Sequence, residues 1–125
     1  MEWYLTRAGA KRLQLEAEQM QSDEGSRRFS LYHDTETGDL MWRGPVSVHG
    51  HLHQDVRLIY DENHPYEKMT IYVRKPELMK HTIHIHPDGS CCVMRDEEWS
   101  PQWTPYTVYL TVLRFLTDYY EGRLE

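Results

Sequence analysis

Two adjacent cysteines, Cys91 and Cys92, are the strongest candidates for chemistry in this sequence. They follow the dipeptide Asp88-Gly89, which is typical of a tight turn. A thiol displayed just after a turn can be reached by a large partner, and exposure with nearby hydrogen-bond donors favours its reactive thiolate form. Cysteine is also among the most often buried residue types, so a pair of small core residues remains an alternative. Because a disulfide between sequence neighbours is badly strained, we expect free thiols and a cytoplasmic protein.

Three carboxylates follow the cysteines, at Asp96, Glu97 and Glu98, four to six residues beyond Cys92. If Cys92 carried an acyl group that an amine attacks, a carboxylate here could orient the amine or take its proton. We take Asp96 as the leading candidate. The alternative for each is an ordinary solvated carboxylate, because acidic side chains are mostly exposed.

The histidines offer a second kind of chemistry. His49, His51 and His53 alternate, so on a strand they would share one face, and His84 and His86 would do likewise. Imidazole and thiolate are suitable ligands for zinc or iron. The spacing matches no standard structural zinc pattern, however, and no Cys-x-x-Cys is present. We therefore favour a hydrogen-bonded or solvated histidine face and expect neither a metal nor another cofactor.

Length and composition restrict the function classes. The chain of 125 residues fits a single domain, and its apolar fraction of 39% favours a packed core over disorder. The net charge of −6 and the scattered basic residues argue against nucleic acid as a partner. No apolar run is long enough to cross a membrane, and the N-terminus lacks the zones of a signal peptide.

The elements that must position these residues can be read from the periodicity. A helix is expected from about Thr6 to Gln21, with Ala10, Leu13, Ala17 and Met20 facing inward and Arg12 and Glu16 on the outer face with the other charged residues. Short β-prone stretches follow between about residues 29 and 73, and their short connections predict an antiparallel meander. They include extended pieces at residues 29–33, at 40–42 with an end near Gly44-Pro45, at 56–60 and at 69–73, and a further one suggested by Val46, Val48 and Leu52.

The second half of the chain divides into an irregular segment and a helix. Residues 76 to 105 show poor periodicity but are rich in Trp, Met and Ile, which makes a functional loop more plausible than disorder. A helix is expected from Thr104 to Glu121, with Thr104 as its cap and Pro105 at its first position. Its apolar stripe includes Tyr109, Leu110 and Leu113, although the β-branched residues leave a strand open for residues 106–113.

The cysteine segment resembles the active-site segment of the ubiquitin-conjugating enzymes. His86-Pro87 matches the start of the family's His-Pro-Asn turn, the run Gly89-Ser90-Cys91-Cys92-Val93 matches its Gly-x-x-Cys-Leu core, and Trp99-Ser100-Pro101 matches its Trp-Ser-Pro. The stretch at residues 61–66 resembles the family's Tyr-Pro-containing stretch before its fourth strand. The resemblance in element order covers most of the chain, but the specific motif covers only residues 83–104.

The resemblance implies an activity and its site. Cys92 aligns with the catalytic cysteine and would accept a ubiquitin-like modifier as a thioester from an activating enzyme, then pass it to an amine of a target protein. The family's asparagine, which supports the oxyanion, has no counterpart here, and His84 or His86 occupies that neighbourhood instead. A histidine before an Asp-Gly turn and an early end after the last helix resemble short bacterial members, which implies a ThiF-like activating enzyme. In the family, the first helix docks the activating enzyme.

We therefore expect an α+β fold: an N-terminal helix, a four-stranded antiparallel meander, a cysteine-bearing irregular segment and a C-terminal helix, as in a truncated ubiquitin-conjugating enzyme spanning residues 1–125. Two alternatives remain. One is a non-enzymatic metal-binding β-domain that uses His49, His51, His84 and His86. The other is a catalytically silent family member that only assembles partners.

Overall fold

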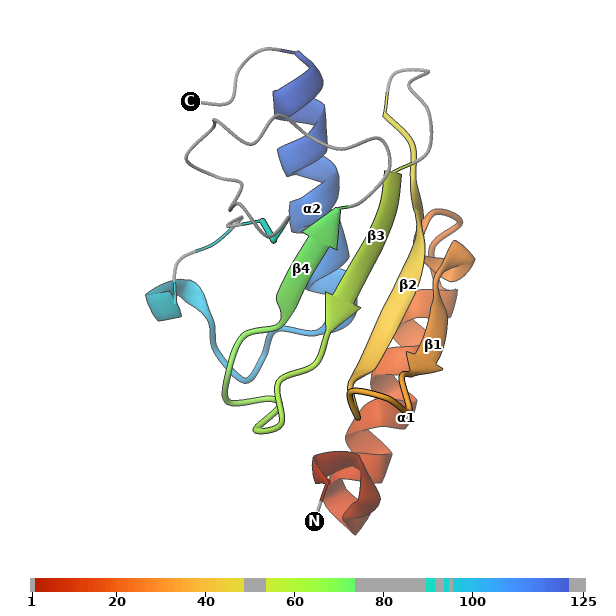
Figure 1. The fold of residues 1–125 in the computed structure, drawn as a ribbon, viewed down its shortest axis with the longest axis vertical. Coiled ribbons are helices and arrows are strands. Elements are labelled where there is room, and N and C mark those ends of the chain that lie inside the picture. Colours follow the sequence, from red (N-terminus) through yellow and green to blue (C-terminus); the bar gives the residue numbers. More distant parts are fainter. Residues whose placement is uncertain (1, 49–53, 74–89, 92–93, 95, 122–125) are drawn as a thin grey trace.

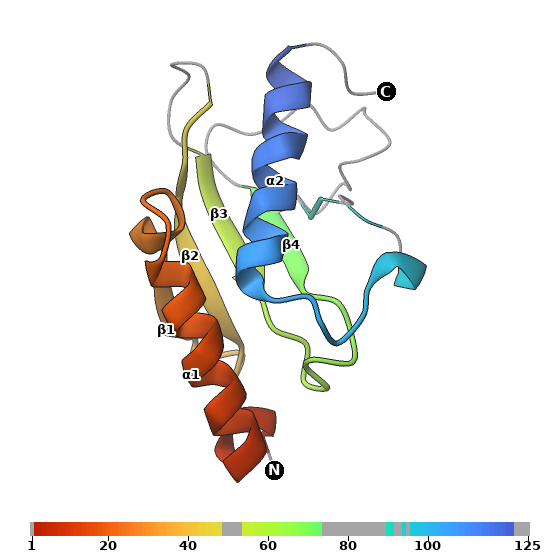
Figure 2. The same ribbon diagram turned by 180° about the vertical axis from the view of Figure 1, so that it is seen from behind.

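A computed structural model describes residues 2–48, 54–73, 90–91, 94 and 96–121. The fold is α+β, with an N-terminal helix, four antiparallel strands and a C-terminal helix. Figure 1 shows the sheet in front of both helices, and Figure 2 shows from behind that α1 and α2 cover the same face of it. The expected fold class is confirmed at this level.

Helix α1 spans Arg7–Gln21 and begins where the sequence predicts. The side chain of Thr6 caps it by accepting a 2.9 Å hydrogen bond from the amide of Gly9. Three of the four residues predicted to face inward are confirmed, because Met20 is buried and Leu13 and Ala17 pack against the core, whereas Ala10 is exposed. Glu16 is buried on this same face. The prediction that Glu16 lies on the solvent side is therefore wrong. Positions 13, 16, 17 and 20 share one helical face, and a carboxylate occupies one of them.

The sheet is a simple meander with strand order β1-β2-β3-β4 and antiparallel neighbours throughout. The strands are β1 (Ser30–His33), β2 (Leu40–Val46), β3 (Gln54–Ile59) and β4 (Thr70–Val73). A separate strand through Val46, Val48 and Leu52 was wrong: Val46 ends β2, Val48 is buried outside any strand, and Leu52 lies outside the described residues. Strand β2 ends at Val46, one residue beyond Gly44-Pro45, near which the sequence predicted its end.

The core lies between the sheet and the two helices. Trp42, Leu58 and Ile71 are aligned across three neighbouring strands and are all buried on the face that the helices cover. The turn between β1 and β2 closes at Gly38, whose φ of 82° is a conformation that glycine adopts without steric cost. The side chain of Asp34 supports this turn by accepting a 2.9 Å hydrogen bond from the amide of Glu36.

Helix α2 spans Pro105–Tyr120, so residues 106–113 are helical and not a strand. Thr104 caps it and Pro105 occupies its first turn, as predicted. The buried stripe consists of Pro105, Val108, Tyr109, Val112, Phe115 and Leu116. Leu110, which was expected in that stripe, is exposed. No helix among the described residues is long and apolar enough to cross a membrane.

Candidate functional site

The segment that carries the cysteines is attached to the edge of the sheet. The amide of Cys91 donates a 2.9 Å hydrogen bond to the carbonyl oxygen of Ile71, and Ser90 forms an antiparallel bridge with Tyr72 in β4. The side chain of Cys91 is buried in the core. The thiol of Cys91 is therefore out of reach of a large partner.

The other predicted catalytic residues divide between described and undescribed parts of the chain. Cys92, His84 and His86 lie outside the described residues, as do the histidines of the alternative metal site at positions 49, 51 and 53. Asp96 is described: it begins a short 3-10 helix, η3 (Asp96–Glu98), and its side chain is 85% exposed. Within the described ranges, no group of three or more His, Cys, Asp or Glu side chains could hold a metal ion.

Asp96 is joined to the body of the protein by a lysine. The ammonium group of Lys68 lies 2.8 Å from a carboxylate oxygen of Asp96 and also donates a 3.4 Å hydrogen bond to the carbonyl of Met94. An exposed ion pair of this kind adds little stability, typically about 0–1 kcal/mol. The ion pair nevertheless keeps an acidic and a basic group close together, and its acidic member, Asp96, lies four residues after Cys92 in sequence.

Trp99 fixes the far end of the cysteine segment. Its indole N–H donates a 2.8 Å hydrogen bond to the carbonyl oxygen of Pro65, and its ring stacks on that of Trp103 with the centroids 5.7 Å apart. Both rings are partly buried against the core. Trp99 therefore anchors its loop onto the core.

The structure also contains a buried polar cluster, and its centre is the carboxylate of Glu16. The hydroxyl of Tyr60 donates to one oxygen at 2.6 Å, while Nε of Arg12 and Nε2 of His64 each lie 2.7 Å from the other. Glu16 and His64 are 1% and 3% exposed. The indole of Trp42 completes the chain with a 2.9 Å hydrogen bond to the Tyr60 hydroxyl. We call Arg12, Glu16, Tyr60 and His64 the Glu16 cluster.

The electrostatics of the Glu16 cluster favour an ionised carboxylate. Burial alone would raise the pKa of Glu16, but the hydrogen bond and charge of His64, with the hydrogen bonds from Tyr60 and Arg12, lower it below its ordinary value of 4.5. Burial and the neighbouring Glu16 charge raise the pKa of Tyr60 well above its ordinary value. Glu16 is therefore a fixed negative charge, and Tyr60 is a permanent donor to it.

The Glu16 cluster connects α1, the connection after β3 and the loop that contains Trp103. Arg12 and Glu16 come from α1, Tyr60 and His64 from the connection after β3, and Arg12 also donates a 2.8 Å hydrogen bond to the carbonyl oxygen of Trp103. Trp3 packs against the cluster, with its ring centroid 4.7 Å from that of His64. We infer a structural role for the cluster: it holds α1, the Pro65 loop and the Trp103 loop in one arrangement.

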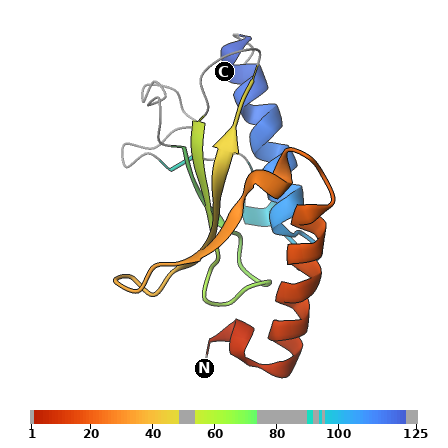
Figure 3. The ribbon, with the colours of Figure 1, turned by 90° about the vertical axis from the view of Figure 1, so that its right-hand side faces the viewer.

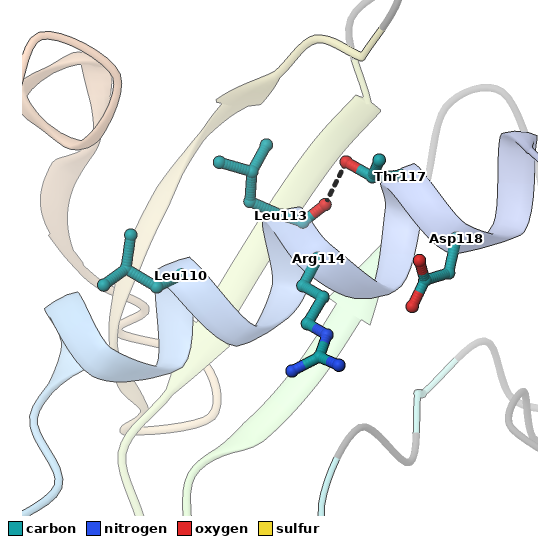
Figure 4. A pocket seen from close by; sticks show the side chains of 5 residues that line it. All are labelled: Leu110, Leu113, Arg114, Thr117 and Asp118. Carbon is teal, nitrogen blue, oxygen red and sulfur yellow. Dashed lines mark hydrogen bonds between the residues drawn. The ribbon is translucent and has the colours of Figure 1, made fainter.

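A separate hollow of about 550 Å³ lies along α2, lined by Leu110, Leu113, Arg114, Thr117 and Asp118 (Figure 4). The hydroxyl of Thr117 donates a 2.7 Å hydrogen bond to the carbonyl of Leu113. None of its lining residues was predicted as a site residue, and none belongs to the Glu16 cluster.

Comparisons with protein-family models, with curated proteins and with solved structures give no match for this chain.

Proposed function

We propose that this chain carries a ubiquitin-like modifier as a thioester on Cys92. In this proposal a ThiF-like activating enzyme supplies the modifier, and an amine of a target protein receives it. The protein is then a transferase related to the ubiquitin-conjugating enzymes, as the motif at residues 83–104 suggests.

One structural observation carries the proposal. The cysteine-bearing segment follows an antiparallel meander and is fastened on both sides of Cys92, at Cys91 by its hydrogen bond to Ile71 and at Trp99 by its hydrogen bond to Pro65. A nucleophile that must meet two large partners in turn benefits from such fixed neighbours, because catalysis depends on holding reacting groups in one geometry. The burial of Cys91 supports Cys92 as the nucleophile.

The chemistry consists of two acyl transfers. In the first, the Cys92 thiolate attacks the carbonyl carbon of the modifier's C-terminal thioester, and the thiolate of the activating enzyme leaves. In the second, a target amine attacks the new thioester, loses a proton, and Cys92 leaves as the thiolate. Each transfer passes through a tetrahedral oxyanion that requires a hydrogen-bond donor, for which His84, His86 or backbone amides are the candidates.

Asp96 supplies the carboxylate for the second transfer in this proposal. Its exposure leaves it open to an incoming amine, and its ion pair with Lys68 limits the positions that the carboxylate can take. It would orient the amine and accept its proton. The adjacent Lys68 offsets the charge of Asp96 itself.

The test is formation of a reducible adduct. The purified chain is incubated with a ThiF-like enzyme, a ubiquitin-like protein and ATP, and the products are separated on gels with and without a reducing agent. Wild type and Cys91→Ala should form the adduct, and Cys92→Ala should not. Circular dichroism of both variants provides the folding control, since Cys91 is buried and its replacement leaves a small cavity.

Three outcomes would redirect the proposal. An adduct that disappears only in Cys91→Ala would transfer the nucleophile to Cys91. A wild-type chain that binds the charged activating enzyme without forming an adduct would favour the silent scaffold. Stoichiometric zinc or iron in protein purified without a histidine tag, lost together with stability on chelation, would favour the metal-binding β-domain.

A further inference from the structure

Strand β1 is an outer strand of the four-stranded sheet. Among the described residues it pairs with β2 only, through the register from Ser30 opposite Arg43 to His33 opposite Leu40. All four of its side chains are exposed, including Leu31 at 41% and Tyr32 at 47%. Figure 3 shows the turn between β1 and β2 extending away from the helices.

The hydrogen-bond pattern identifies the backbone groups on the open edge. The amide of Asp34 donates a 2.8 Å hydrogen bond to the carbonyl of Asp39, toward the β2 side. Since backbone groups alternate between the two sides of an antiparallel strand, Tyr32 and Ser30 also face β2. The amides and carbonyls of Leu31 and His33 therefore face outward. Within the described ranges, no hydrogen bond joins these outward groups to another segment of the backbone.

The edge carries no charge that would oppose pairing. Natural edge strands are protected by being very short, by lysine, proline or inward-pointing charges, or by a covering element, and in the described part of the chain β1 has only the first of these. The sequence Ser-Leu-Tyr-His of β1 contains no proline, lysine, arginine or acid. Its flanks, in contrast, are charged with opposite signs: Arg27 and Arg28 precede β1, while Asp34 and Glu36 follow it.

We propose that a second copy of this chain pairs with β1 in antiparallel orientation, which joins two sheets into one. Hydrogen bonds between the two strands can form only between backbone amides and carbonyls that face outward in both copies. A two-fold arrangement therefore places Leu31 opposite Leu31, or Tyr32 opposite Tyr32, of the second copy. The basic residues that precede β1 in one copy then lie near the acidic residues that follow β1 in the other. A parallel arrangement would instead bring like charges together, and cross-strand pairs of like charge are destabilising.

The charge pairs form between copies and not within one chain. Arg28 precedes β1 and Asp34 follows it, so the extended strand keeps the two side chains apart within one chain. The interface is small, because a pair of four-residue strands covers less than the roughly 1,200–2,000 Å² of a standard stable interface. The expected dimer is therefore weak and reversible, with a Kd on the order of 10–1,000 µM.

Sedimentation equilibrium of the full chain over a concentration series that spans this range tests the proposal. Wild type should pass from monomer to dimer with rising concentration. Leu31→Pro removes an amide that faces outward, a position where an edge strand tolerates proline. This variant should stay monomeric with a wild-type circular dichroism spectrum. Leu31→Val keeps the donor and the β propensity, so it is the matched control and should dimerise as wild type.

Reversing the charges of residues on either side of β1 tests the antiparallel arrangement without changing the sequence of the strand. Arg28→Glu and Glu36→Arg should each raise the Kd by roughly three- to thirty-fold, because each brings like charges near one another at both ends of the paired strands. The double variant should have a lower Kd than either single variant. Wild type that is monomeric throughout, or a Leu31→Pro variant that folds and dimerises as wild type, would overturn the proposal. A double variant no better than the weaker single variant would overturn the antiparallel arrangement.

Discussion

Substitution of Glu16 should destabilise the protein more than any other single change on α1. Its carboxylate is 1% exposed and accepts from Arg12, Tyr60 and His64 at 2.6–2.7 Å. Removing it leaves the Arg12 guanidinium without its charge partner and Tyr60 without its acceptor. Buried groups that lose a partner bear the full cost of desolvation, which is larger than the net gain from forming the bond.

The magnitude can be worked from these contacts. Glu16→Ala removes all three interactions and a charge, and breaking a buried ion pair by removal of one partner costs about 3–5 kcal/mol. Glu16→Gln keeps an oxygen that can accept from Tyr60, but its amide nitrogen faces the ring nitrogen of His64 and the Arg12 donor. It should therefore lose at least the charge-assisted hydrogen bond from Arg12, roughly 1.5–3 kcal/mol. A domain with about 5–15 kcal/mol in total would unfold partly in the alanine variant if it lies near the lower limit.

Urea unfolding followed by tryptophan fluorescence and by circular dichroism gives the free energy of unfolding. Glu18→Gln is the matched control, because Glu18 is exposed on the same helix and should change stability by less than about 0.5 kcal/mol. The m-value should stay constant, which separates a change in stability from a change in compactness. A Glu16→Gln variant within 0.5 kcal/mol of wild type would refute the reasoning, since it would mean that the cluster does not stabilise the fold.

The same comparison has a defined pH dependence. The pKa of Glu16 in the folded protein lies below its ordinary value of 4.5. A depressed pKa contributes stability that is fully present above the unfolded value and is lost as the pH falls through the folded value. The difference between wild type and Glu16→Gln should therefore be constant near neutral pH and shrink below about pH 4.5. A difference that grows as the pH falls would contradict the assigned ionised state.

Local signals predicted most of the fold correctly. Thr104 followed by Pro105 marks the start of α2, because a hydroxyl caps the first free amides and proline needs no amide partner there. Alternation and short turns predicted the meander, since antiparallel strands allow short connections. The extra strand after Val46 was wrong because β propensity cannot distinguish the end of one strand from the start of another.

The Glu16 cluster could not be predicted, for a physical reason. The positional signal was present, because Glu16 shares a helical face with Leu13, Ala17 and Met20. Residue type argued against burial, since an acidic side chain is almost never buried unless it is paired. The partners that permit burial, Tyr60 and His64, are 44 and 48 residues away in sequence. No local pattern records such a pairing.

The proposed oxyanion donors and the proposed docking helix can each be tested by substitution. His84→Ala with His86→Ala should slow discharge of the thioester onto an amine, by on the order of 10²–10³, more than it slows loading; single-turnover discharge at the wild-type rate would leave backbone amides as the donors. For the helix, Arg7 and Lys11 are the exposed cations to reverse, because Arg12, which the sequence placed beside them, is bound to the Glu16 cluster and to Trp103. Rim charges set association rate and salt dependence, so the double reversal to Glu should slow loading by the activating enzyme at low salt, and the effect should fade at high salt. The melting temperature of the double-reversal variant should match that of wild type, since acidic residues suit the first turn of a helix. The single variant Arg12→Glu should have a lower melting temperature than wild type. Loading of the double reversal at the wild-type rate in low salt would mean that α1 does not dock the activating enzyme through these charges.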